Sequence, residues 1–222
     1  MSALAVSSPR EFACPALESG DRMDAAEFHW RYERRPDIKK AELIDGVVYV
    51  ASPVNTQKHG SPHFNLVGAF SAYAHVTDGV IGSDNSTIKL DKSALGRGNE
   101  PQPDIALYWD SGHAGQTRLD ADGWLISAPD LVAEVAYSSR SYDLGDKKEL
   151  YRRIGVREYV VWQVEEGRID WWQLLDGQYV SLLPADHGVI HSLVFPGLKL
   201  DVPALLSQVP AAKLPKRPTR RS

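Results

Sequence analysis

The sequence has little cysteine and no long apolar run. Its 222 residues include a single cysteine, Cys14, which excludes an intramolecular disulfide and a cysteine-based zinc cage. No run approaches the roughly 18 apolar residues that a membrane-spanning helix needs. The first eight residues lack the basic region and the long apolar region of a signal peptide. We therefore expect no membrane partner and a cytoplasmic location.

A surplus of positive charge is also missing. The net charge is -4, whereas proteins that bind phosphate backbones normally carry a basic surface. The C-terminal tail is the exception, since residues 213–221 contain five lysines and arginines that could add nonspecific affinity for phosphate. The alternative is a solvated end without function. The chain is long enough for one sizeable core, and we expect a domain over residues 23–206 between flexible segments at 1–22 and 207–222.

Local patterns predict an alternation of helices and strands. Asp24 with Glu27 three positions later predicts a helix to about Arg34, and Asp45-Gly46 between apolar runs predicts a β-hairpin. Apolar spacing further predicts helices over 62–78 and 142–154, strands over 80–90, 105–109, 131–137 and 156–164, a hairpin over 168–183 and a last strand over 194–200. This order indicates an α/β or α+β domain around a mixed sheet. Residues 131–164 fit one parallel βαβ unit.

Two carboxylates interrupt apolar strands. Glu134 stands within the run 131–136, where both strand faces are mostly apolar. An ionised carboxylate there costs several kcal/mol, roughly, unless a cation, a hydrogen-bond network or a pKa shift offsets it. One such residue is as readily explained by a structural ion pair with Arg or Lys. Because Asp104 also opens an apolar run, 105–109, the two together favour a divalent cation.

Lys147 is the third member of this constellation. Asp143, Lys147 and Tyr151 are spaced by four on the predicted helix, so they lie on one face. If that face packs on the sheet, their polar ends approach Glu134. The alternative is an exposed Asp143–Lys147 pair, which would contribute only a few tenths of a kcal/mol.

Two histidines are candidates for the substrate side of a site. His59 and His63 are four residues apart, but Pro62 between them disfavours a helical turn that holds both. We therefore expect them to line a cleft rather than to bind metal. Asp130 follows Pro129 at the mouth of a strand and has the position of a turn or cap residue.

Tryptophans could stack on bases, but in alternating strands they are more typical of a core or an interface. Trp162, Trp171 and Trp172 are in this position. The last hairpin, with Trp171 and Trp172, could therefore supply a homodimer surface.

Several motifs occur in a fixed order between residues 22 and 205. They are Glu42-Leu43-Ile44-Asp45-Gly46, Gln102-Pro103-Asp104, the segment 128–135, Tyr142-Asp143-Leu144-Gly145-Asp146-Lys147 with Tyr151, and Gly155-Val156-Arg157-Glu158-Tyr159. In this order the chain resembles the Uma-two family, described as restriction endonucleases of the PD-(D/E)XK nuclease superfamily. The resemblance implies a restriction-endonuclease-like fold, with a mixed β-sheet core flanked by helices, an N-terminal hairpin and a C-terminal hairpin.

The resemblance also implies the metal ligands. Asp104 and Glu134 would bind Mg²⁺ or Mn²⁺, with the Val135 carbonyl as a further ligand. Glu42 would be the additional acidic residue near the metal. Hard oxygen ligands of this kind select these two cations.

The catalytic lysine is displaced in this sequence. The superfamily pattern has a lysine two residues after the glutamate, where this chain has Ala136. The resemblance assigns that role to Lys147 on the following helix. Gln102 and Tyr151 are further candidates for the substrate side.

The implied function is a metal-dependent endonuclease that hydrolyses DNA phosphodiester bonds, with duplex DNA as the expected partner. One alternative is an inactive nuclease-fold protein that binds nucleic acid or a protein partner. Another is a structural dimerisation domain whose acidic residues pair with arginines. Metal binding by Asp104 and Glu134 would distinguish these cases.

Overall fold

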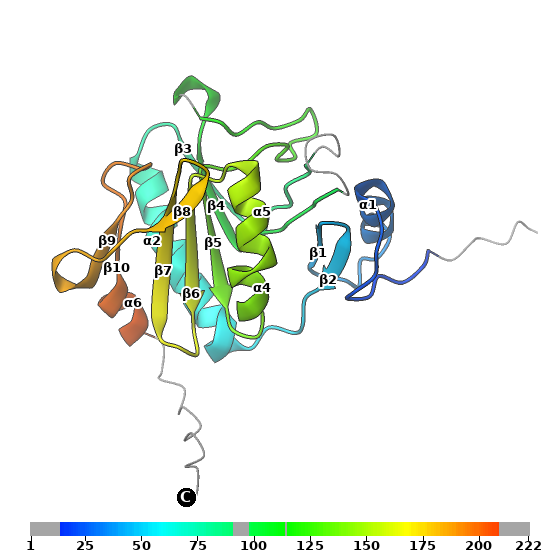
Figure 1. Cartoon of the computed structure of the whole chain (residues 1–222), viewed down its shortest axis with the longest axis horizontal. Coiled ribbons are helices and arrows are strands. Elements are labelled where there is room, and N and C mark those ends of the chain that lie inside the picture. The colour runs from blue at the N-terminus through cyan, green and yellow to red at the C-terminus, as the bar shows by residue number, and fades with distance from the viewer. Residues whose placement is uncertain (1–13, 91–97, 114, 209–222) are drawn as a thin grey trace, which may run out of the picture.

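The computed structural model describes residues 14–90, 98–113 and 115–208, and Figure 1 shows a mixed sheet with helices packed around it. The helices are α1 (Ala25–Glu33), α2 (Ser61–Val76), α4 (Arg140–Leu144), α5 (Asp146–Ile154) and α6 (Val202–Ser207), with short turns η1 (Thr56–Gly60), η2 (Ser111–His113) and η3 (Asp186–Gly188). The strands are β1 (Ala41–Ile44), β2 (Val47–Val50), β3 (Val80–Asp84), β4 (Ile105–Trp109), β5 (Leu131–Ala136), β6 (Glu158–Gln163), β7 (Arg168–Leu175), β8 (Gln178–Ser181), β9 (Val189–His191) and β10 (Lys199–Asp201).

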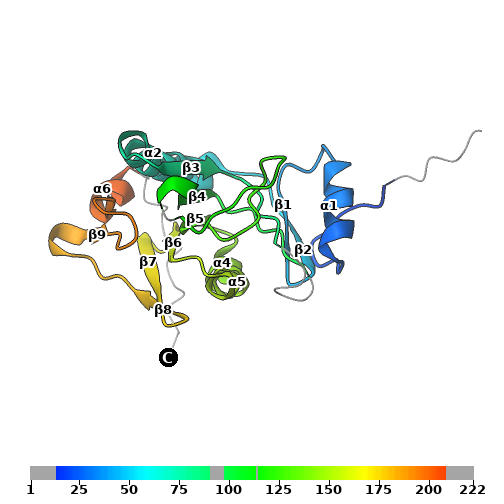
Figure 2. The same ribbon diagram turned by 90° about the horizontal axis from the view of Figure 1, so that it is seen from above.

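The central sheet has the order β3-β4-β5-β6-β7-β8. Strands β5 and β6 are parallel and are joined through α4 and α5, whereas the other neighbours are antiparallel. In Figure 2, α2 lies on one side of this sheet and the α4–α5 pair on the other. The predicted α+β class, the mixed sheet and the parallel βαβ unit are therefore confirmed.

The two faces of strand β5 pack against different helices, and this determines the side on which Glu134 lies. Leu131, Ala133 and Val135 belong to the core under α2. Val132 and Ala136 belong to the opposite core, which also contains Tyr151 of α5. Since alternate side chains of a strand share a face, Glu134 points with this second set toward α5.

The N-terminal hairpin forms as predicted. Asp45 and Gly46 have φ of 49° and 76°, the positive values that a tight hairpin turn requires. Asp24 caps α1 by accepting a hydrogen bond from the backbone of Glu27 at 3.0 Å. Helix α1 and strands β1 and β2 enclose a small core of their own around Phe28 and Leu43.

The proposed flexible N-terminus is described only in part. Residues 1–13 lie outside the described residues, but the following segment pairs with β2. Gly20 donates its N–H to the Val48 carbonyl at 2.8 Å, and Val48 donates to Asp21 at 2.9 Å. Leu17 is buried against the hairpin. The domain boundary at residue 23 stays a prediction, and the basic residues 213–221 are outside the described chain.

Two predicted elements are not continuous over their predicted ranges. The helix predicted over 142–154 is divided into α4 and α5 at Gly145, which has φ -106° and ψ -101°. The strand predicted over 80–90 stops at Asp84, because Asn85 has a positive φ of 49° and turns the chain away from the sheet. The Asn85 N–H donates to the Asp104 carbonyl at 3.1 Å.

The C-terminal region departs most from the prediction. Residues 194–198 form a turn rather than a strand, with the Ser192 N–H donated to Leu198 O at 3.0 Å and φ of 86° at Gly197. The strand there is β10, which pairs with β9. Helix α6 begins after Asp201, which accepts from the Ala204 N–H, and this N-cap went unrecognised in the sequence.

The last hairpin does not present its tryptophans as a surface. Trp171 is buried in the core under α2, and Trp172 in the core on the α5 side, where Lys148 Nζ lies 3.4 Å from its ring centre. Both side chains are therefore packed within the chain and offer no exposed ring, and a homodimer surface on this hairpin stays a prediction. Trp162 is a core residue, as its strand pattern indicated. Among the described residues, none of the helices has the length and apolar character to cross a membrane.

Candidate metal and catalytic site

The four residues expected to be catalytic form one buried cluster. Asp104 directly precedes β4, Glu134 lies in the neighbouring β5, Glu42 comes from the hairpin and Lys147 from α5. The Asp104 backbone N–H donates to Glu134 Oε2 at 3.3 Å. Lys147 Nζ lies 2.6 Å from Glu134 Oε1 and 2.9 Å from Glu42 Oε1. Residues separated by up to 105 positions therefore meet at one end of the sheet.

Asp104 is held through both of its carboxylate oxygens. Oδ2 accepts the Val135 N–H at 2.8 Å and lies 3.2 Å from His59 Nε2. Oδ1 accepts from Lys40 Nζ at 2.6 Å. Burial opposes the ionised form, but Lys40, His59 and Lys147 hold the pKa of Asp104 well below its usual range.

Lys147 lies deeper than the carboxylates that it contacts. Its side chain is 2% exposed and also faces Asp143 Oδ1 at 3.9 Å. Burial alone would lower the pKa of Lys147, but Glu134, Glu42 and Asp143 raise it well above its ordinary value. The predicted shared face of Asp143, Lys147 and Tyr151 is present, although Gly145 interrupts the helix between the first two.

The cluster contains more acidic than basic groups. Its carboxyl groups belong to Glu42, Asp104, Glu134 and Asp143, and its ammonium groups to Lys40 and Lys147. With every group ionised, four negative charges would face two positive ones. Burial raises the pKa of Glu134, and it raises that of Asp143 to about 6. These shifts mean that Glu134 and Asp143 favour their neutral forms unless further positive charge lies nearby.

A divalent cation would supply this positive charge. Asp104 and Glu134 offer hard oxygen ligands, and one charge of +2 would balance the excess of two carboxylates. Among the described residues, no group of three or more His, Cys, Asp or Glu side chains is arranged so that it could hold a metal ion. Mg²⁺ commonly uses only one or two carboxylates and keeps several waters, so two protein carboxylates are sufficient. The Val135 carbonyl remains a predicted ligand.

The two histidines lie on the open side of the cluster. His59 is in η1 and His63 in α2, with ring centres 5.4 Å apart. The two histidines thus lie in different elements, and Pro62 lies in the first turn of α2, where its missing N–H is tolerated. His63 Nε2 lies 2.9 Å from Asp84 Oδ1. With side-chain exposures of 26% and 17%, the histidines can contact a substrate.

The other two substrate-side candidates differ from each other. Tyr151 is completely buried and donates its hydroxyl to Glu134 Oε1 at 3.0 Å, so it cannot contact a substrate. It orients the carboxylate instead. Gln102 is also largely buried: its backbone N–H donates to Glu42 Oε1 at 2.6 Å, and its side chain donates to Asn85 O at 2.6 Å.

Lys40 is a site residue that sequence reasoning missed. It follows Lys39, and two adjacent lysines are typical of an exposed, solvated surface. The available signal was its distance of two residues from Glu42, since residues i and i+2 of a strand share a face. Asp130 proves to be structural, because it is buried, accepts the Trp109 N–H at 3.0 Å and pairs with Arg157 at 3.0 Å.

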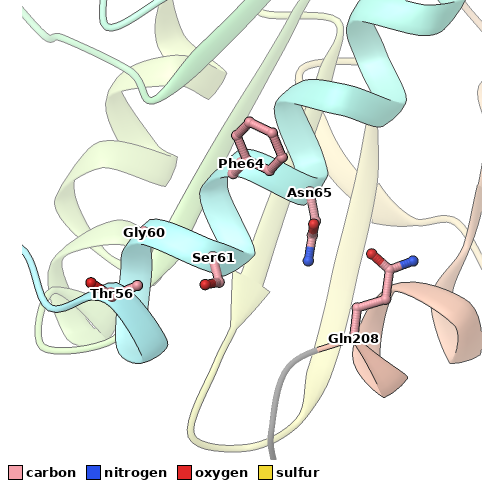
Figure 3. Close-up of a pocket in the computed structure, with 6 residues that line it drawn as sticks. All are labelled: Thr56, Gly60, Ser61, Phe64, Asn65 and Gln208. Atoms are coloured by element: carbon pink, nitrogen blue, oxygen red, sulfur yellow. The ribbon is translucent and has the colours of Figure 1, made fainter.

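A hollow of about 420 Å³ lies outside the cluster, between the start of α2 and the end of α6. Figure 3 shows Asn65 and Gln208 extending into the space between these helices, with Thr56 and Ser61 nearby. Its lining contains no titratable side chain and none of the clustered residues. This hollow therefore lies apart from the candidate catalytic residues.

Comparison with known proteins agrees with this fold. The crystal structure of "a putative nuclease belonging to DUF820" from Anabaena variabilis ATCC 29413 matches with a TM-score of 0.59 and 15% sequence identity, over 76% of this chain and 90% of that chain. At this identity the match shows the fold, which is therefore nuclease-like. The profile of the Uma2 family, described as "Putative restriction endonuclease", matches residues 25–203, and the chain belongs to this family. Curated proteins contain no match to the sequence.

Proposed function

We propose that the protein is a Mg²⁺- or Mn²⁺-dependent endonuclease that hydrolyses phosphodiester bonds of duplex DNA. The family supports nuclease chemistry in general. The observation that carries the proposal is the buried pair Asp104–Glu134 with Lys147 Nζ 2.6 Å from Glu134 Oε1. A buried acidic excess beside solvent-accessible histidines is suited to a cation that in turn holds a phosphate.

Asp104 Oδ1 and Glu134 Oε2 are the oxygens that would hold the metal, which would displace Lys40 from Oδ1. The other oxygen of Asp104 is engaged by the Val135 N–H, and the other oxygen of Glu134 by Lys147 and Tyr151. A bound metal of this type would neutralise a phosphate oxygen and lower the pKa of a coordinated water.

The surrounding side chains would position the acids and stabilise charge. Lys147 holds Glu134 and Glu42 in place, and its ammonium supplies positive charge close to the reacting phosphate. His59 orients Asp104 from the open side of the site. Lys40 is 22% exposed, so once released from Asp104 it can reach a phosphate oxygen.

The proposal is tested by Mn²⁺ calorimetry combined with plasmid cleavage. Asp104→Ala and Glu134→Gln are expected to abolish measurable Mn²⁺ binding and cleavage, and Lys147→Met to lower cleavage by about 100-fold or more. Asp78→Asn, at a fully exposed carboxylate, is the matched control. Unchanged Mn²⁺ binding in both acidic variants would refute the proposed site.

A nuclease-fold protein that binds DNA without cutting it is the second candidate. Ala136 occupies the position where the superfamily pattern has its lysine, and the replacement Lys147 is buried below the carboxylates. Duplex binding that is normal while no cleavage occurs with Mg²⁺ or Mn²⁺ would favour this second candidate.

A further inference from the structure

A second cavity adjoins the carboxylate cluster. It has a volume of about 610 Å³, within the range of small-molecule sites, and lies beside β3 and β4. The lining residues that matter here are Tyr32, Tyr108, Trp124, Ser83, Asn85 and Gln102. It is distinct from the hollow of Figure 3, with which it shares no residue.

Two of its residues connect it directly to the proposed catalytic cluster. Gln102 lies two residues before Asp104, and its N–H is bonded to Glu42. Asn85 Oδ1 accepts from Lys40 Nζ at 3.2 Å, and the same ammonium contacts Asp104. A group bound in the cavity would therefore be adjacent to a phosphate held at Asp104.

The lining determines the chemistry of the ligand. Tyr32, Tyr108 and Trp124 contribute three aromatic rings, whereas the one charged residue among the described lining is Asp122. The described lining offers a phosphate no cation and one repelling carboxylate, and the Lys89 ammonium, which is not part of that lining, lies 3.8 Å from the centre of the Trp124 ring. A flat, uncharged ring would instead find aromatic surfaces, which stack on any base.

Unused polar groups are also present. Ser83 Oγ is buried and has no hydrogen-bond partner among the described residues. Tyr108, which also lines the cavity, carries a hydroxyl that can donate or accept a hydrogen bond. Buried polar groups normally have partners, and the edge of a heterocycle supplies donors and acceptors of the required kind.

We propose that this cavity binds one unpaired nucleobase of the substrate strand, next to the phosphate that is cleaved. The inference rests on the proposed endonuclease function and specifies its substrate. The base could come from a single-stranded segment or from a nucleotide turned out of a duplex. In both cases the stacking surface is the same.

The test uses binding rather than cleavage. A short single-stranded oligonucleotide, and versions with one abasic position at each site in turn, are titrated by fluorescence anisotropy with Ca²⁺ in place of Mg²⁺. One abasic position is expected to weaken binding by about 5-fold to 150-fold, the range expected for loss of one stacked base. A duplex with one unpaired base, compared with a fully paired duplex, identifies the source of the base.

Trp124→Leu should weaken binding of the intact oligonucleotide by a similar factor and remove the difference between intact and abasic strands. Trp30→Leu is the matched control, since Trp30 is 44% exposed and lies outside the cavity. If Trp124→Leu does not fold, Tyr108→Phe and Ser83→Ala take its place and should reduce discrimination between the four bases.

Equal binding of every abasic strand, or full discrimination in the Trp124→Leu variant, would overturn the inference. Neither result would affect plasmid cleavage that depends on Asp104 and Glu134. Conversely, loss of the abasic penalty in Trp124→Leu would support the base site even in a protein that does not cut.

Discussion

Lys40 and a divalent cation would compete for the same oxygen. Lys40 Nζ is 2.6 Å from Asp104 Oδ1, the oxygen that is otherwise free for a metal. Its second partner is Asn85, so the ammonium is held by two contacts and not by the carboxylate alone. Metal binding must therefore displace an ion pair, and this lowers the apparent affinity.

We predict that Lys40→Met tightens Mn²⁺ binding by about tenfold, the factor expected when a charge-assisted hydrogen bond no longer competes. In chelator the same variant should melt at a lower temperature, because Asp104 loses its closest cation. Calorimetry and thermal melting measure the two effects, with Lys39→Met as the control. Weaker Mn²⁺ binding by Lys40→Met would show that the lysine assists the metal.

Asp143 gives a pH-dependent prediction. Burial raises the pKa of Asp143 to about 6, so the folded state binds a proton more tightly than the unfolded state does. The stabilisation is complete below about pH 4 and is lost as the pH rises through about 6. Asp143→Asn, which cannot ionise, should therefore become more stable relative to the native chain between pH 4 and pH 8.

The measurement is a series of thermal melts across that pH range in chelator, with Asp78→Asn as the exposed control. The gain of Asp143→Asn at pH 8 relative to pH 4 should be of the order of 3 kcal/mol, from the size of the shift. A difference between the two proteins that does not change with pH would contradict the assignment.

At the scale of elements, local signals were sufficient wherever one residue type determines the backbone. Asp24 predicted the start of α1 and Asp45-Gly46 predicted the hairpin, because few residue types can cap a helix or adopt a positive φ. The faces of β5 followed from strand alternation. The meeting of Asp104, Glu134 and Lys147 was expected from the burial cost of carboxylates and from the family motifs.

The missed features depend on tertiary contacts. Asn85 ends β3 because its N–H reaches Asp104, which no local pattern encodes. Glu158 fixes the C-terminal turn by accepting from Ser192, Leu193 and Val194, all more than 30 residues away. Lys40 became a site residue only through its contact with Asp104, 64 residues away.

Gly145 is predicted to be essential for placing Lys147. A Cβ at this position would lie 2.7 Å from the Ser141 carbonyl oxygen, so the backbone of α4 would have to move. Gly145→Ala should lower the melting temperature and weaken Mn²⁺ binding by several-fold. Gly68→Ala is the control, because its Cβ meets nothing within 4 Å inside α2 and should stabilise the helix by about 0.5–1 kcal/mol. Equal stability of both variants would contradict this role.

At the scale of the whole molecule, we expect the net charge of -4 to make the proposed DNA binding depend on the cation. We predict that duplex affinity is at least about tenfold weaker in EDTA than in Ca²⁺, because the acidic cluster then faces phosphate without compensation. Fluorescence anisotropy measures both conditions. A chain ending at residue 208 separates this effect from the basic tail, and equal affinity in EDTA and Ca²⁺ would place DNA elsewhere on the protein.

The cluster draws its residues from separately packed parts of the chain. Glu42 lies in β1 of the hairpin, directly after Lys40 and Ala41, and the hairpin packs around Phe28 and Leu43, whereas Glu134 lies in β5 of the central sheet and Asp104 directly precedes β4. Local opening of a small unit requires less free energy than global unfolding. We therefore expect the backbone amides of β1 to exchange with solvent sooner than those of β5. Local unfolding of the hairpin would then separate Glu42 from Glu134 and Lys147 while the central sheet stays folded.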